Sequence, residues 1–174
     1  IQRMYFQCPS DEDVSGWSEE MIWDELQRRV DGPDGFELKR GHIFDKMVLR
    51  FRSYVCEPLR YGNLFLAGDA GHTVPPTGAK GLNLAFADVR VLFEGLESFA
   101  STGSRDILDK YSDRALQRIW KAQNFSYWMT SMLHERPDTN PFERKRQLGE
   151  LGAVVNSRYG SAYLAEAYTG WPSG

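Results

Sequence analysis

The sequence predicts an α+β fold: an antiparallel sheet comes first, then one more strand with its following helix, then a helical C-terminal region. Before residue 60, apolar and polar residues alternate in three short segments, as in strands that bury one face. At residues 64–67 an apolar run of strand length stops at a Gly-Asp pair. From residue 81 onward, apolar side chains recur at helical spacing over long segments.

Three strands and one helix are expected in the first part of the chain. The strands are predicted at residues 3–8, 36–39 and 46–57, the last with Met47, Leu49 and Phe51 on one face. Ser18 is a suitable helix N-cap, because two glutamates follow it and acidic side chains favour the first turn. The turn G-P-D-G at residues 32–35 ends that helix.

Helices are expected to fill the second part of the chain. A turn at residues 61–63 precedes the short buried strand at 64–67, and helices follow at 81–100, 104–134, 143–151 and 161–168. In the first of these helices the stripe expected to face the core consists of Leu82, Ala85, Val89, Leu92 and Leu96.

The composition excludes some classes of partner. A net charge of −3 over 174 residues argues against nucleic acid or an anionic membrane surface. Two cysteines are too few for a disulfide framework and lack metal-ligand spacing, so we expect no bound metal and a reducing, cytoplasmic compartment. No apolar run approaches the roughly 20 residues that a membrane span needs.

The segment that carries the chemistry is G-D-A-G-H-T-V-P-P-T-G-A-K-G-L-N-L at residues 68–84. Asp69 follows a strand and a flexible glycine, where its carboxylate can accept hydrogen bonds from hydroxyl groups. The amides from Gly81 to Asn83 open a helix, so they lack partners within the helix and stand at the positive end of its dipole. This arrangement is typical of a site for a polar, planar cofactor.

The segment resembles the second FAD-contacting motif of the flavoprotein aromatic hydroxylases. The similarity includes R-S-Y-V and E-P at residues 52–58, R-I-W-K-A at 118–122, W-M-T-S at 128–131 and A-E-A-Y-T-G at 165–170. It covers nearly the whole chain. The resemblance implies an α/β FAD-dependent monooxygenase, of which this chain would be an α+β portion.

The resemblance also implies roles at the cofactor. Asp69 would bind the ribityl chain of FAD, and the amides of Leu82 and Asn83 would face the pyrimidine edge of the flavin, with Gly81 also at the cofactor. Arg3 would lie against the flavin, and Arg52 at the nicotinamide-nucleotide side. Lys80 would add positive charge near the flavin, although an exposed, solvated lysine is an equal alternative.

Other residues would contact the substrate. Tyr5 would hold the substrate carboxylate, and the carbonyl of Pro76 would accept a hydrogen bond from the phenolic hydroxyl, beside Thr77. Tyr168 would contact the same phenolic oxygen and pass on its proton. His72 is interpreted as a structural residue rather than an acid–base group.

The implied reaction is the hydroxylation of 4-hydroxybenzoate to 3,4-dihydroxybenzoate with FAD, NADPH and O₂, in a homodimer. Residues 1–60 would belong to a substrate-covering sheet, 61–100 to the FAD domain and 101–174 to a helical dimerisation region. No G-x-G-x-x-G motif for the dinucleotide pyrophosphate occurs, and the chain starts with isoleucine, so we interpret it as the C-terminal portion of a longer enzyme. A related phenolic-acid hydroxylase, NADH in place of NADPH, and a non-catalytic interaction domain remain alternatives.

Overall fold

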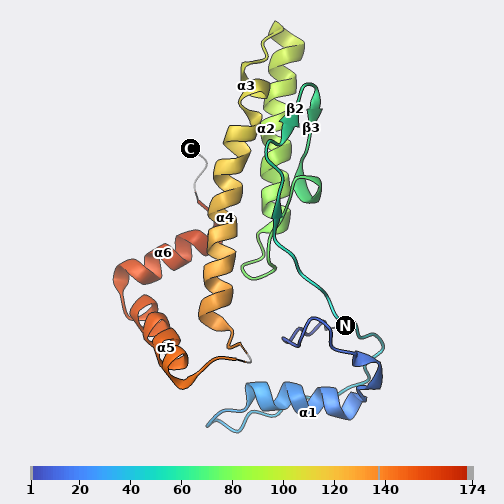
Figure 1. The fold of residues 1–174 in the computed structure, drawn as a ribbon, viewed down its shortest axis with the longest axis vertical. Helices are drawn as coiled ribbons and strands as arrows, with labels where there is room; N and C mark the ends of the chain where they lie inside the picture. The colour runs from blue at the N-terminus through green and yellow to red at the C-terminus, as the bar shows by residue number, and fades with distance from the viewer. Residues whose placement is uncertain (1, 137, 172–174) are drawn as a thin grey trace. The chain divides into compact units, whose positions relative to one another are not determined.

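The computed structural model describes residues 2–136 and 138–171, and the chain divides into two units. The first is Ile1–Arg50 and the second is Phe51–Gly174. Figure 1 labels the elements of both units, and each unit is described by itself below. The division comes earlier in the chain than the boundary expected at residue 60. The assignment of segments to substrate, FAD and dimerisation domains stays a prediction.

The first unit is built around helix α1 (Glu19–Val30), which follows the short 3₁₀ helix η1 (Val14–Gly16). Ser18 caps α1 as predicted, because its Oγ accepts a hydrogen bond from the amide of Met21 at 3.2 Å. The buried face of α1 consists of Ile22, Trp23 and Leu26, against which Phe6, Trp17, Leu38 and Ile43 pack.

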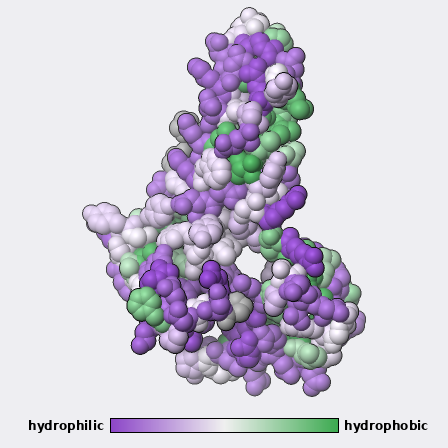
Figure 2. Space-filling view, viewed as in Figure 1, coloured by the Kyte–Doolittle hydropathy of each residue, from purple (hydrophilic) through white to green (hydrophobic). Residues whose placement is uncertain are grey.

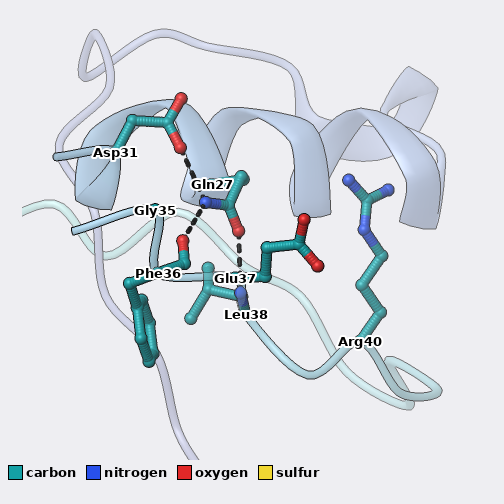
Figure 3. Close-up of a pocket in the computed structure, with 7 residues that line it drawn as sticks. All are labelled: Gln27, Asp31, Gly35, Phe36, Glu37, Leu38 and Arg40. Atoms are coloured by element: carbon teal, nitrogen blue, oxygen red, sulfur yellow. Dashed lines mark hydrogen bonds between the residues drawn. The ribbon is translucent and has the colours of Figure 1, made fainter. Parts of the chain in front are cut away.

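The strands predicted at 3–8 and 36–39 are absent from the described part of this unit, and of 46–57 only two residues pair. Residues 36–38 bind a side chain of α1 instead: Gln27 accepts from the amide of Leu38 and donates to the carbonyl of Phe36, each at 2.8 Å (Figure 3). A strand needs the backbone of a neighbouring strand to form its ladder. The apolar face expected at 47–51 stays exposed, with Met47 at 63% and Phe51 at 59%.

The second unit contains two small antiparallel strand pairs. β1 (Tyr54–Val55) pairs with β4 (His72–Thr73), and β2 (Arg60–Tyr61) pairs with β3 (Leu64–Phe65). The 3₁₀ helix η2 (Gly68–Ala70) leads from β3 to β4. The buried strand expected at 64–67 is therefore a short hairpin strand. Its first side chain, Leu64, is 61% exposed, whereas the next one, Phe65, packs against the core.

Within the described residues, five helices complete the second unit. They are α2 (Gly81–Thr102), α3 (Asp106–Asp109), α4 (Tyr111–Leu133), α5 (Pro141–Val155) and α6 (Arg158–Thr169). The single helix expected at 104–134 is interrupted at Lys110, whose backbone leaves the helical conformation. The next residue explains the break: Tyr111 packs edge-on against Phe65 and donates its hydroxyl to the carbonyl of Leu66 at 2.7 Å. Tertiary contacts outweigh local helix propensity here.

Helices α2 and α4 lie side by side and enclose the main core (Figure 1). Most of the stripe predicted to be buried on α2 is wrong: the buried positions are Leu84, Asp88, Val91 and Gly95. Of the predicted residues, Leu92 packs against the core, whereas Leu82, Val89 and Leu96 are exposed. A Cβ on Gly95 would come within 2.6 Å of Leu108 Cδ2, so α3 approaches α2 where α2 has no side chain. The core cluster comprises Leu59, Leu84, Val91, Tyr111, Ala115, Ile119 and Ala122.

The opposite face of α2 is an exposed apolar stripe. Its exposed large residues are Leu82, Phe86, Val89, Phe93 and Leu96, which recur at helical spacing. Figure 2 shows apolar residues at the surface over the part that α2 and the β2–β3 hairpin occupy.

A second apolar cluster joins α4 to the two C-terminal helices. Phe125, Met129 and Met132 of α4 pack with the fully buried Ala167 of α6. The partly buried residues around them are Trp128, Leu151, Val154, Leu164 and Trp171. This cluster places the end of α6, and Tyr168 with it, next to the middle of α4.

Candidate functional site

The predicted Gly-Asp turn is the 3₁₀ helix η2, and its shape depends on Gly68. This residue has φ +58°, a conformation that a side chain disfavours. A Cβ at this position would also come within 3.2 Å of the Ala85 side chain on α2. Both the backbone angle and the close approach of α2 therefore require glycine.

The turn leaves the Asp69 side chain open to solvent. Asp69 is exposed, and no hydrogen bond or ion pair within residues 2–136 and 138–171 engages its carboxylate. Its neighbours on either side are held: Gly68 donates its amide to Asp88, and Gly71 donates to the carbonyl of Gly68 at 2.8 Å. A fixed backbone thus carries a carboxylate whose acceptor sites remain available for hydroxyl groups.

The loop before α2 contains two consecutive residues with positive φ, Gly78 at +88° and Ala79 at +50°. A Cβ on Gly78 would lie 2.8 Å from Phe125 Cε1, so the backbone of the loop packs directly against the Phe125 ring on α4. The Pro76 carbonyl accepts the amide of Ala79 at 2.9 Å, which closes the turn. A carbonyl oxygen has a second lone pair, so this bond leaves the predicted substrate contact of Pro76 possible.

The amides at the start of α2 have the chemistry that the predicted site requires. The first backbone bond of the helix runs from Leu84 N to Lys80 O at 3.0 Å, and no side chain caps the N-terminus. The amides of Gly81, Leu82 and Asn83 therefore have no acceptor in the described chain. Since donors at a helix N-terminus favour a ligand that carries negative charge, this set fits the carbonyl-bearing edge of a flavin.

Lys80 lies inside the protein, so the alternative of a solvated lysine is wrong. Its side chain is 5% exposed, and its ammonium donates a hydrogen bond to the main-chain carbonyl of Tyr168. The ammonium also lies 5.2 Å from the Phe125 ring centroid and 5.6 Å from that of Tyr168. Burial lowers the pKa of Lys80 below its ordinary value.

Four of the predicted site residues meet around the loop and α6. Pro76, Thr77 and Lys80 belong to the loop before α2, and Lys80 contacts Tyr168. Thr77 Oγ1 accepts a hydrogen bond from Thr130 Oγ1 on α4 at 2.7 Å, which fixes the loop beside α6. The Tyr168 side chain is 54% exposed and packs edge-on against Phe125.

Three further predicted site residues belong neither to the loop before α2 nor to α6. Arg3 and Tyr5 lie in the first unit, both exposed, with Arg3 Nη1 3.4 Å from the Tyr5 hydroxyl. Arg52 is exposed, and its carbonyl accepts from Thr73 Oγ1 at 3.0 Å at the edge of the β1–β4 pair.

The sequence did not identify the partner of His72. His72 Nε2 lies 2.7 Å from Asp88 Oδ2, and both side chains are 1% exposed. Burial, with the Asp88 carboxylate nearby, raises the pKa of Tyr111 far above its ordinary value, so its hydroxyl remains a donor. The sequence contained one signal for the partner of His72, because Asp88 interrupts the apolar pattern of α2.

A shallow pocket in the first unit offers no comparable chemistry. It is lined by Gln27, Asp31, Gly35, Phe36, Glu37, Leu38 and Arg40 (Figure 3). The amide group of Gln27 binds the Asp31 carboxylate and the backbone at 36 and 38, so these polar groups are already paired. None of the predicted site residues lines it.

Within 2–136 and 138–171, no group of three or more His, Cys, Asp or Glu side chains is arranged to hold a metal ion. None of the helices in that part of the chain combines the length and the apolar character needed to cross a bilayer.

Comparison with known proteins agrees with the resemblance of the sequence. The FAD binding domain family model matches residues 1–126. The p-hydroxybenzoate hydroxylase of Acinetobacter baylyi is 45% identical over 170 residues, which is 98% of this chain and 42% of that protein. YetM of Bacillus subtilis, named as an FAD-dependent monooxygenase, is 29% identical over 82% of this chain and 38% of its own length.

A third relative matches a shorter segment. The kynurenine 3-monooxygenase of Chaetomium globosum is 37% identical over 67 residues, which is 38% of this chain and 13% of that protein. The chain spans about two fifths of the length of the Acinetobacter baylyi hydroxylase and of YetM.

Proposed function

The chain belongs to the FAD binding domain family, and we propose that it is the C-terminal portion of an FAD-dependent aromatic hydroxylase. The observation that carries the proposal is the set of free donors at the start of α2 beside an open carboxylate. The amides of Gly81, Leu82 and Asn83 lack acceptors in the described chain, and Asp69 has no partner there. Similarity to a p-hydroxybenzoate hydroxylase over 98% of the chain supports the same proposal.

The cofactor contacts divide between the two features. The Asp69 carboxylate binds hydroxyl groups of the ribityl chain, and the amides of Leu82 and Asn83 bind the pyrimidine edge, where negative charge accumulates on reduction. The helix dipole behind these amides favours that charge. FAD, reduced by NADPH, supplies the activated oxygen, and the protein supplies position, charge and the exclusion of water.

The substrate contacts lie at the loop and at α6. The Pro76 carbonyl accepts a hydrogen bond from the phenolic hydroxyl, and Thr77 lies beside it. The Tyr168 hydroxyl accepts the phenolic proton as it passes its own proton on, so it relays the proton and stays neutral. Removing that proton enriches the ring in electrons, which the transfer of electrophilic oxygen requires. We propose 4-hydroxybenzoate as the substrate and 3,4-dihydroxybenzoate as the product, with Tyr5 on the carboxylate.

Two other contacts come from the resemblance. Arg3 lies against the flavin in this proposal, and Arg52 is on the side that receives the nicotinamide nucleotide. The helical region from residue 101 onward supplies contacts of a homodimer.

The exposed face of α2 supports the idea that more polypeptide belongs to this fold. Leu82, Phe86, Val89, Phe93 and Leu96 form a contiguous apolar stripe, each of them at least half exposed. Monomeric proteins rarely leave such a stripe open. In the proposed enzyme the rest of the FAD domain covers it.

Two alternatives make different predictions. A related hydroxylase would act on another phenolic acid and would oxidise NADPH fastest with that acid. A non-catalytic interaction domain would bind neither flavin nor phenol, and it has no need for unpaired amides beside an open carboxylate.

The test uses the complete protein that contains this chain. We expect it to purify with bound FAD and to consume NADPH faster when 4-hydroxybenzoate is added. Benzoate, which lacks the phenolic hydroxyl, is the matched control and should not yield hydroxylated product. A protein without flavin, or with equal NADPH consumption in the presence and absence of every phenolic acid, would contradict the proposal.

A further inference from the structure

Two buried side chains hold the turn that carries Asp69, and neither has a role in the proposed chemistry so far. One oxygen atom, Asp88 Oδ2, accepts the amide of Gly68 at 3.0 Å and lies 2.7 Å from His72 Nε2. Both side chains are 1% exposed. This single atom therefore joins the first residue of the turn, the strand that follows it and the middle of α2.

A carboxylate in this position is costly unless it is fully paired. Moving a carboxylate out of water carries a large penalty, and an apolar side chain on the buried face of α2 would avoid it. An apolar side chain would, however, leave the amide of the buried Gly68 without the acceptor it has in Asp88. The pairing therefore favours one particular conformation of the turn.

Other bonds hold the flanks of the turn and the carbonyl of Gly68, but they do not reach the amide of Gly68, the residue before Asp69. The hydroxyl of Tyr111 donates to the carbonyl of Leu66 at 2.7 Å, and the backbone amide of Cys56 donates to the carbonyl of Gly71 at 2.7 Å. Only Asp88 binds the amide of Gly68, the residue with φ +58° that directly precedes Asp69. The direction in which the chain presents Asp69 depends on this bond.

We propose that Asp88 is a positioning residue for the flavin site: it holds Gly68 in the left-handed conformation that presents the Asp69 carboxylate to the ribityl hydroxyls. His72 holds the Asp88 carboxylate in place from the side of β4. This inference rests on the proposed function, since it assigns a positioning residue to the same FAD site. Asp88 itself does not touch the cofactor.

The experiment is a double-mutant cycle on FAD affinity in the complete enzyme, measured by quenching of flavin fluorescence. Asp88→Asn keeps the size of the side chain but removes its charge, and we expect it to weaken FAD binding about tenfold. Because Asp88 acts through Asp69, Asp88→Asn combined with Asp69→Ala should bind FAD about as weakly as the weaker single variant. Val91→Ala, on the same helix and equally buried, is the control: it should lower the Tm and leave the FAD Kd unchanged.

The inference is overturned if Asp88→Asn lowers the Tm as Val91→Ala does but binds FAD like the wild type. Full additivity of Asp88→Asn and Asp69→Ala also overturns it. Should Asp88→Asn not fold, His72→Ala replaces it in the same cycle, and the same two outcomes decide. A wild-type enzyme that binds no FAD overturns the proposed function and this inference with it, so the two failures are distinguishable.

Discussion

The ammonium of Lys80 donates a hydrogen bond to the main-chain carbonyl of Tyr168, although the two residues are 88 positions apart in the sequence. The contact is inside the protein, with Lys80 5% exposed and its charge above the rings of Phe125 and Tyr168. It connects the loop that precedes the free amides of α2 with the end of the helix that carries the proposed catalytic tyrosine. This contact therefore links the proposed cofactor side of the site to its proposed substrate side.

Replacing Lys80 with methionine should change how stability depends on pH. Burial lowers the pKa of Lys80 in the folded protein below its unfolded value of 10.5, so the buried charge opposes folding wherever the lysine is protonated. As pH rises from the folded pKa towards the unfolded one, the unfolded chain binds more protons, and the wild type gains stability relative to Lys80→Met. Thermal unfolding of both proteins over the alkaline range measures this difference. A stability difference that does not vary with pH would contradict the buried position of the ammonium.

Asp69→Ala in the complete enzyme should weaken FAD retention without unfolding the turn. A charged acceptor that faces hydroxyl groups contributes roughly 1.5–3 kcal/mol, so the loss should be about ten- to a hundredfold in affinity. The exposed Asp69 side chain has no partner in the described residues, so its removal should leave the Tm nearly unchanged. Equilibrium dialysis against FAD measures the effect. Unchanged affinity would mean that the carboxylate has no part in cofactor binding.

Tyr168→Phe should preserve folding and FAD binding but slow hydroxylation. The ring remains, so its edge-on packing against Phe125 and its contact with Lys80 survive. Only the hydroxyl is lost, and a correctly placed proton-transfer group is commonly worth about 10²–10⁴ in rate. NADPH consumed and product formed are measured side by side, and the ratio of product to NADPH should fall. Tyr163→Phe, five positions earlier on α6, is the matched control. A Tyr168→Phe enzyme with wild-type rate and coupling would make Tyr168 a structural residue only.

The isolated 174-residue chain should not hold FAD. Its sequence lacks the G-x-G-x-x-G motif that binds the pyrophosphate of a dinucleotide, so only the flavin and ribityl contacts remain. FAD titrated into the purified chain should show no saturable fluorescence quenching at micromolar levels. Tight stoichiometric binding would show that the chain alone is sufficient.

Local signals predicted the helices well. The cap at Ser18, the start of α2 after a glycine-rich loop and the two C-terminal helices each depend on residues close together in the sequence. The strand predictions for the first unit failed because a strand depends on a partner backbone, and an alternating pattern does not reveal whether such a partner is present. The break at Lys110 depends on the contacts of Tyr111 with Phe65 and Leu66, which no local pattern records.

The candidate site could be predicted only for the residues that belong to a sequence motif. Asp69 and the amides of α2 follow from the order of strand, turn and helix, and the structure leaves both without partners in the described chain. Their roles, like those of Arg3, Tyr5 and Arg52, stay predictions. The pairing of His72 with Asp88 joins residues on different elements, and it depends on which face of α2 turns inward. The predicted apolar stripe did not include the face that carries Asp88, so the partner of His72 could not be found.

The most direct test of the central claim is the fate of molecular oxygen. The complete enzyme is supplied with FAD, NADPH, 4-hydroxybenzoate and ¹⁸O₂ in ordinary water, and the mass of the product is measured. A flavin-dependent hydroxylase places one labelled oxygen atom in each molecule of 3,4-dihydroxybenzoate. Unlabelled product, or no hydroxylated product from an enzyme that retains its FAD, would contradict the assignment.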